Sequence, residues 1–304
     1  MKLLKRRDFS AQFNDTFSFL RLNGKHYFKN YLIVNGIQLL FMLLIIYFFI
    51  SSFYGLSTFD TGNSSAVFED YIKNNLVVFI IVMTVFVVVA ILFAIVQYSY
   101  TPIYLLLYNE KGGTNFTAKD ILHQIFKVKL GKIIIFFLTS LLIAIPTLIV
   151  AAIAGVILLI TIVGIFFLIA AIAMWYNNAL MEYLSSDKGV FECFGYSFEL
   201  IKINFWANVG AVGLFILLIG VVNGGISLVT TMLTSLVSFN TIDASEKGII
   251  TMISMVVSFI IAKIISIFLQ IINQLAINIV YFSAKEENEN ISGLSEIDKI
   301  GLGE

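Results

Sequence analysis

Long runs of apolar residues, separated by shorter polar segments, dominate the pattern of this sequence. A helix that crosses a bilayer needs about 20 mostly apolar residues, and several runs reach that length. The run 133–176 has no charged residue and would measure about 65 Å as one helix, about twice the hydrocarbon thickness. We expect it to fold back at the small residues 151–155, with Gly164 as the alternative turn. The predicted spans are 31–56, 76–100, 133–153, 156–176, 207–236 and 249–282.

The residues that flank the spans predict three regions. Residues 1–30 are expected to form a cytoplasmic amphipathic helix, 31–282 a six-span transmembrane domain, and 283–304 a cytoplasmic tail. A basic amphipathic helix beside a membrane typically lies in the interface. The alternative is a helix packed on the protein's own cytoplasmic loops. In the first region apolar residues recur every three or four positions, along one helix face: Phe9, Phe13, Phe17, Leu20, Gly24 and Phe28.

A short motif recurs before three of the spans. Residues 17–23 read Phe-Ser-Phe-Leu-Arg-Leu-Asn, residues 198–204 read Phe-Glu-Leu-Ile-Lys-Ile-Asn, and 125–129 form a weaker copy. One interpretation is three parallel repeats, each an amphipathic helix followed by a two-span hairpin. The other is convergence on one interfacial design. The residues expected at the interface are Phe17, Arg21, Asn23, Phe198, Lys202, Asn204 and Trp206.

Composition restricts the class of protein. Hydrophobic residues make up 59% of the chain and charged residues 12%, whereas an ordinary soluble domain is about 25% charged. So few charges exclude a soluble globular enzyme, and so apolar a chain is not disordered. The 19 basic and 19 acidic residues give no net charge, so the basic excess of nucleic-acid binders is missing. The sequence therefore predicts an all-α integral membrane protein with six transmembrane helices and amphipathic interfacial helices.

The basic residues are sorted to one side of the predicted spans. Sixteen of the 19 lie before the first span, after the second, after the fourth, or in the tail. The opposite side has Lys73 and Lys247, and Lys263 lies within the sixth span. Because cytoplasmic segments carry the excess of Lys and Arg, we expect both termini in the cytoplasm.

The stretch 189–206 resembles a signature of bacterial multi-pass membrane proteins. These are similar to the membrane domain attached to some glycerophosphoryl diester phosphodiesterases, and the tail 296–301 is similar to relatives from the Bacteroidetes. The resemblance implies the inner membrane of a bacterial cell. This sequence departs from it at Gly195 and Tyr196, where relatives more often have basic residues, and at Cys193, where alanine is usual. No hydrolytic residue is carried over, because the phosphodiesterase reaction belongs to a soluble domain.

Few residues of this sequence suit catalysis. One cysteine and two histidines exclude a multi-Cys or His-rich metal site. No Asp or Glu lies within a predicted span, so no carboxylate pair is available there for acid–base chemistry. No phosphate-binding glycine loop is present. We therefore expect no catalytic residue, no metal and no cofactor, and hence no enzyme.

Lys263 is the sharpest polar feature of the spans. A charge inside a span is costly and marks a candidate functional site. Gln270, Gln274 and Asn278 follow it along the same helix face. These four residues predict a cavity or a lipid contact. The alternative is structural, with Lys263 snorkelling towards water and the amides holding neighbouring helices together.

The function expected from these patterns is that of a non-enzymatic multi-pass membrane protein that organises a membrane complex or interacts with lipid. The alternative is a transporter or channel with a cavity around Lys263. The expected partners are the lipid bilayer and other membrane proteins, and no nucleic acid is expected.

Overall fold

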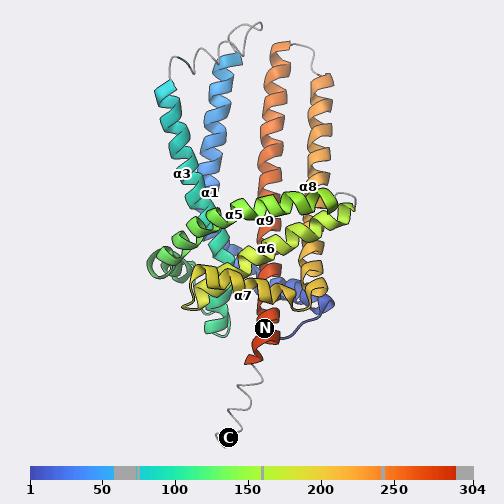
Figure 1. Cartoon of the computed structure of the whole chain (residues 1–304). Coiled ribbons are helices and arrows are strands. Elements are labelled where there is room, and N and C mark those ends of the chain that lie inside the picture. The colour runs from blue at the N-terminus through green and yellow to red at the C-terminus, as the bar shows by residue number, and fades with distance from the viewer. Residues whose placement is uncertain (58–72, 74–75, 159–160, 241–243, 292–304) are drawn as a thin grey trace, which may run out of the picture. The chain divides into compact units, whose positions relative to one another are not determined.

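The computed structural model describes residues 1–57, 73, 76–158, 161–240 and 244–291. Within these residues the regular structure is helical and no strand occurs, which confirms the predicted all-α class for this part of the chain. Figure 1 shows the helices, which are α1 (Phe9–Ser57), α3 (Leu76–Glu110), α4 (Ala118–His123), the π-helix η1 (Gln124–Val128), α5 (Leu130–Leu158), α6 (Ile162–Ser185), α7 (Val190–Lys202), α8 (Phe205–Asn240) and α9 (Ala244–Glu289).

Five helices among the described residues are long and apolar enough to cross a membrane. They match five of the predicted spans. The other predicted span, 31–56, lies in α1, where the side chains beyond residue 41 fall outside the described residues. A total of six spans therefore stays a prediction. The five segments are Met83–Glu110, Leu130–Leu158, Gly164–Ser185, Phe205–Met232 and Ile260–Glu289.

The turn between the third and fourth predicted spans lies at neither expected position. α5 continues through 151–155 to Leu158, and α6 begins at Ile162, after Thr161 with its extended backbone. Alanine is the best helix former, and a single glycine costs about 1 kcal/mol. The small residues therefore continue the helix instead of breaking it. Gly164 lies inside α6, so the alternative turn is wrong as well.

The predicted boundary at residue 30 falls inside one helix. α1 runs without interruption from Phe9 to Ser57. No proline lies between these ends, and the isolated residues Gly24 and Gly36 do not remove a backbone hydrogen bond as proline would. The amphipathic region and the first predicted span therefore form one continuous helix.

The chain forms two compact units. In unit 2, Gln38 Nε2 of α1 donates to Gln97 Oε1 of α3 at 3.1 Å. The rings of Phe41 and Phe93 lie 5.6 Å apart on the same two helices. Unit 1 comprises Met1–Val34, Tyr98–Val221 and Phe268–Glu304, and unit 2 comprises Asn35–Gln97 and Val222–Ile267.

Within unit 1, α6 extends from α8 to α9. Near its start, Phe166 lies against Gly213 of α8, where a Cβ atom would be 3.7 Å from the Phe166 carbonyl oxygen. Ala170 and Met174 are then buried among valine and isoleucine side chains of α8 and α9. Figure 1 shows α5 and α6 running across the direction of the first part of α8. The last turns of α6 therefore lie against α9.

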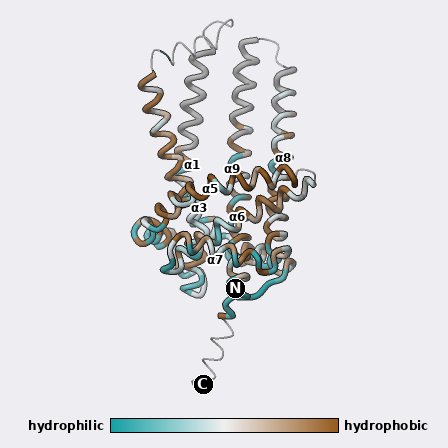
Figure 2. The backbone as a smooth tube through the Cα atoms, viewed as in Figure 1, coloured by the Kyte–Doolittle hydropathy of each residue, from teal (hydrophilic) through white to brown (hydrophobic). Residues whose placement is uncertain are grey.

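α5 is apolar around most of its circumference. Figure 2 shows hydrophobic residues along this helix, and most of its leucine, isoleucine and valine side chains are exposed. The Tyr176 hydroxyl of α6 donates to Thr147 Oγ1 of α5 at 3.3 Å. Small residues let two helices approach closely, and α5 has a half-buried stripe of them: Ser140, Ala144, Thr147, Ala151 and Gly155.

Aromatic and hydroxyl side chains join α1 to α3 in unit 1. The Tyr27 hydroxyl lies 2.7 Å from Thr101 Oγ1. His26 Nδ1 lies 2.8 Å from the Tyr104 hydroxyl, and His26 Nε2 lies 2.8 Å from the Phe116 carbonyl oxygen. A carbonyl oxygen can only accept, so Nε2 donates to it and Nδ1 accepts from the tyrosine. His26 therefore fastens the segment after α3 to α1.

Candidate functional site

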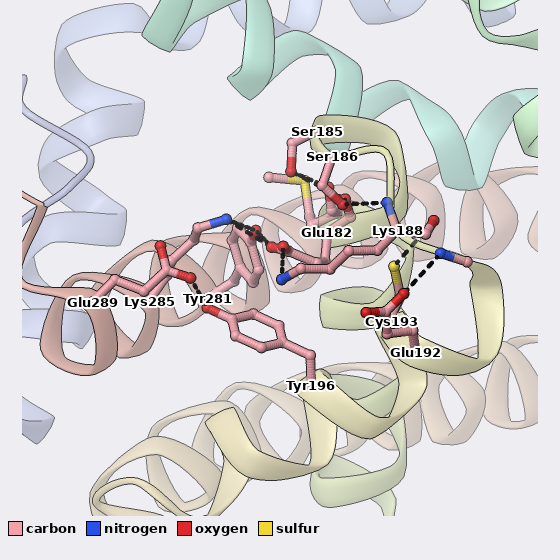
Figure 3. Close-up of polar contacts among 12 residues, drawn as sticks. Glu182, Ser185, Ser186, Lys188, Glu192, Cys193, Tyr196, Tyr281, Lys285 and Glu289 are labelled. Carbon is pink, nitrogen blue, oxygen red and sulfur yellow. Dashed lines mark hydrogen bonds and ion pairs between the residues drawn. The ribbon is translucent and has the colours of Figure 1, made fainter.

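The buried carboxylate of Glu182, in the last turn of α6, binds three side chains of unit 1 (Figure 3). One carboxylate oxygen accepts from Lys188 Nζ at 2.8 Å. The other accepts from Lys285 Nζ and from the Tyr281 hydroxyl, each at 2.7 Å. We refer to these four side chains as the Glu182 clamp.

The helices explain how the clamp is assembled. Tyr281 and Lys285 are four residues apart on α9, so they lie on the same face of that helix. Lys188 follows Glu182 by six residues and returns over the turn that ends α6. The clamp therefore connects the end of α6, the start of α7 and the end of α9.

Lysines also complete the C-terminal end of α6. The last carbonyl groups of a helix have no partner within the helix, and cations near this end are favourable because it is the negative end of the helix dipole. Lys129 Nζ donates to the Leu184 carbonyl oxygen. Lys132 Nζ donates to the Ser186 carbonyl oxygen at 2.7 Å. Lysines at the start of α5 therefore also bind the C-terminal end of α6.

Tyr196 extends the clamp to α7. Its hydroxyl donates to a Glu289 carboxylate oxygen at the end of α9, and Lys188 Nζ lies 4.0 Å from the centre of its ring. Burial raises the pKa of Tyr196, and the bond to Glu289 raises it further. The hydroxyl therefore stays protonated and remains a donor. α7 is fixed to α9 through this contact.

The chemistry of the clamp favours holding over catalysis. Two ammonium groups and a phenol occupy the Glu182 carboxylate, and the bond to Glu182 raises the pKa of Lys188. Burial raises the pKa of the nearby Cys193 thiol, so it is a poor nucleophile. Among the described residues no group of three or more His, Cys, Asp or Glu is placed to hold a metal ion.

Glu182 was not among the candidate residues predicted from the sequence. The signal was present, because no charged residue lies between Lys132 and Glu182. A lone carboxylate at the end of such a stretch needs a cationic partner when it is buried. The partner on α9 is 103 positions away along the chain, and no sequence pattern connects the two.

The second copy of the motif lies on the outside of unit 1. Phe198, Lys202 and Trp206 are exposed, and Lys202 Nζ lies 4.5 Å from the centre of the Phe198 ring. Asn204 separates α7 from α8 with φ of 44°, a left-handed conformation that asparagine tolerates. Its Nδ2 lies 2.7 Å from both carboxylate oxygens of Glu287.

The first copy of the motif has different surroundings. The Phe17 ring packs against Phe215 of α8, with centroids 5.7 Å apart, while Arg21 is exposed. Asn23 is half-buried within α1, whereas the equivalent Asn204 ends a helix. The surroundings therefore differ at Asn23 and Asn204, one of the two positions where the copies are identical. The parallel repeats stay a prediction, as does interfacial placement of both copies.

The residues expected around Lys263 are all on α9, with different exposure. Lys263 and Gln270 are exposed, Gln274 is half-buried and Asn278 is fully buried. Asn278 Nδ2 donates to the Gln274 carbonyl oxygen at 2.7 Å and to Asn177 Oδ1 of α6 at 3.4 Å. Asn278 thus joins two helices, as the structural alternative expects. The cavity itself stays a prediction.

No protein-family model, no curated protein and no solved structure matches this chain. The resemblance of residues 189–206 to the membrane domain of glycerophosphoryl diester phosphodiesterases therefore stays an expectation.

Proposed function

We propose that this chain is a non-enzymatic multi-pass protein of a bacterial inner membrane, with six spans and both termini in the cytoplasm. In this proposal it contacts lipid through α7 and the start of α8, and it organises neighbouring membrane proteins around that surface. The five apolar helices and the sorting of basic residues support the membrane placement and the orientation.

The observation that carries the proposal is the two-sided character of α7. Its inner face is buried through Val190, Cys193, Phe194, Ser197, Leu200 and Ile201. On the outside, Phe191 and Phe198 are 71% and 53% exposed, and Trp206 in the first turn of α8 is 76% exposed. We refer to these three side chains as the outer aromatic stripe.

An outer aromatic stripe of this kind is costly in water. Large aromatic side chains contribute most when they are removed from water, and tryptophan is enriched at the membrane–water interface. Trp206 begins a helix that is long and apolar enough to cross a membrane. The start of such a helix is where an interface is expected, so lipid is the occupant that best fits the stripe.

The clamp supports a fixed orientation for this surface. Tyr196 ties α7 to the end of α9, and Lys188 ties the start of α7 to Glu182. The Trp175 indole nitrogen of α6 also donates to the Phe194 carbonyl oxygen at 2.9 Å. α7 is therefore held from two helices while its aromatic side stays outward, as an organising surface requires.

The test uses the two tryptophans of the chain. A Trp175→Phe variant, reconstituted in phosphatidylcholine vesicles, leaves Trp206 as the sole indole, and brominated lipids then report its depth by quenching. We expect the strongest quenching from bromines near the headgroup–acyl boundary, because interfacial helices bury their apolar face by about 5–10 Å. Trp206→Phe is the matched control, since its remaining indole is Trp175. Absence of quenching of Trp206 would refute the proposal.

A further inference from the structure

The exposed side of α1 carries three cations in regular spacing. Arg21, Lys25 and Lys29 are all exposed and are spaced by four residues. At about 100° and 1.5 Å per residue, they lie within one third of the helix circumference and extend over about 12 Å. We refer to them as the basic stripe.

Within the described parts of the chain, no acidic side chain forms an ion pair with the basic stripe. Among the residues that the structure describes, none of the three cations has a hydrogen bond or an ion pair. The nearest acid on α1, Asp15, is instead bound by Arg7 Nε at 2.7 Å. By contrast, Lys202, on the second copy of the motif, pairs with Glu199 at 2.8 Å. The three charges of the stripe are therefore available to a ligand.

Apolar side chains continue the same face of α1. Leu32 and Ile33 are exposed and lie within the same third of the circumference. The opposite face is buried through Tyr27, Asn30 and Tyr31. Leu22, next to Arg21, is also exposed on this face. Beyond Lys29 the exposed face becomes apolar within one turn, at Leu32. This is the order in which a phospholipid presents its phosphate and its acyl chains.

We infer that the basic stripe binds anionic phospholipid, with the phosphate on Arg21, Lys25 and Lys29 and the acyl chains along Leu32 and Ile33. The inference rests on the proposed membrane placement and names the lipid class. An acidic protein segment would satisfy the charges but would leave the adjoining apolar side chains exposed. Phosphatidylglycerol is the simplest lipid with the required charge, and phosphatidylcholine is the neutral comparison.

Spin-labelled phosphatidylglycerol and phosphatidylcholine, each added to phosphatidylcholine vesicles that contain the full chain, give the test. The fraction of label that the protein immobilises measures its relative affinity for each lipid. One cation near an anionic surface contributes about a fivefold factor, and salt screens part of it. We expect a preference of about tenfold for phosphatidylglycerol, lost in an Arg21→Gln, Lys25→Gln, Lys29→Gln variant.

A matched control removes the same charge elsewhere. Lys111, Lys119 and Lys127 are exposed on the segment between α3 and α5, and the Lys→Gln triple variant there should keep the preference. An equal loss in both variants, or no preference in the unaltered protein, would overturn the inference. If the first variant fails to fold, the unaltered protein is measured in 1 M salt, where the Debye length is about 3 Å. The salt should abolish the lipid preference, and a preference that persists in 1 M salt would also overturn the inference.

The depth of Trp206, measured in the same vesicles, separates this inference from the proposed function. An interfacial Trp206 without lipid preference removes the basic stripe as a lipid site and leaves the proposed function standing. A Trp206 that no brominated lipid quenches removes the proposed function itself.

Discussion

Replacing Glu182 by glutamine should unfold the protein more easily, because it removes the one negative charge that two lysines share. The amide keeps the size of the side chain and can still accept from Tyr281. Lys285 and Lys188 would then face a neutral group. A buried cation left without its partner typically costs 3–5 kcal/mol.

The exposure of the two lysine side chains predicts a loss of unfolding free energy near the lower end of that range. The Lys285 side chain is 17% exposed and regains little hydration, and a hydrogen bond to a charged group contributes about 1.5–3 kcal/mol. The Lys188 side chain is 35% exposed, so water screens its pair and less than about 1 kcal/mol is lost there. We expect a total loss of about 3 kcal/mol in the free energy of unfolding.

The assay is reversible unfolding of the detergent-solubilised protein in sodium dodecyl sulfate, followed by tryptophan fluorescence. Glu199→Gln is the matched control, since Glu199 pairs with Lys202 at the same 2.8 Å in an exposed position. Exposed pairs contribute about 0.2–1 kcal/mol. Equal losses in the two variants would refute the reasoning that burial makes the Glu182 clamp important.

Three further predictions concern other parts of the chain. The Thr117 backbone N–H and hydroxyl lower the pKa of Asp120. The stability that this carboxylate contributes should therefore be present above about pH 4 and be lost as the pH falls through its lowered pKa. Asp120→Asn should abolish that part of the acid dependence in unfolding curves. His26→Ala should lower the free energy of unfolding by about 2 kcal/mol, because two hydrogen bonds are lost. Hydrogen exchange should show reduced protection at residues 111–117, and unchanged protection there would contradict the fastening role of His26. Lys263→Ala should leave folding and lipid preference intact if Lys263 only snorkels, whereas loss of solute flux across proteoliposomes with normal assembly would favour the transport alternative.

The sequence was sufficient to predict the helices but not their ends. Apolar runs of the right length mark five segments because length and hydropathy are local properties. The turn predicted at 151–155 is wrong, because small residues such as Ala151 and Gly155 do not interrupt backbone hydrogen bonds and continue α5 to Leu158. The continuity of α1 was missed for a related reason, since a change from polar to apolar side chains does not interrupt backbone hydrogen bonds.

The Glu182 clamp could not be predicted because it depends on tertiary contacts. Its α9 partners, Tyr281 and Lys285, lie about 100 positions from Glu182, and each looks like an ordinary residue at the end of a helix. Phe198 and Trp206 are exposed, and their placement at a membrane interface stays a prediction. The sequence did not reveal that the other face of α7 is buried against the protein.

The separation between Glu182 and Lys285 also sets an order of events during synthesis. Ribosomes add about 5–20 residues per second, so the 103 positions between them take about 5–20 s to make. During that interval α6 has left the ribosome with Lys188 as the only lysine of the clamp, and α9 does not yet exist. The Glu182 clamp can therefore be completed only after α9 has been made, and until then the carboxylate has Lys188 as its one lysine partner in the clamp.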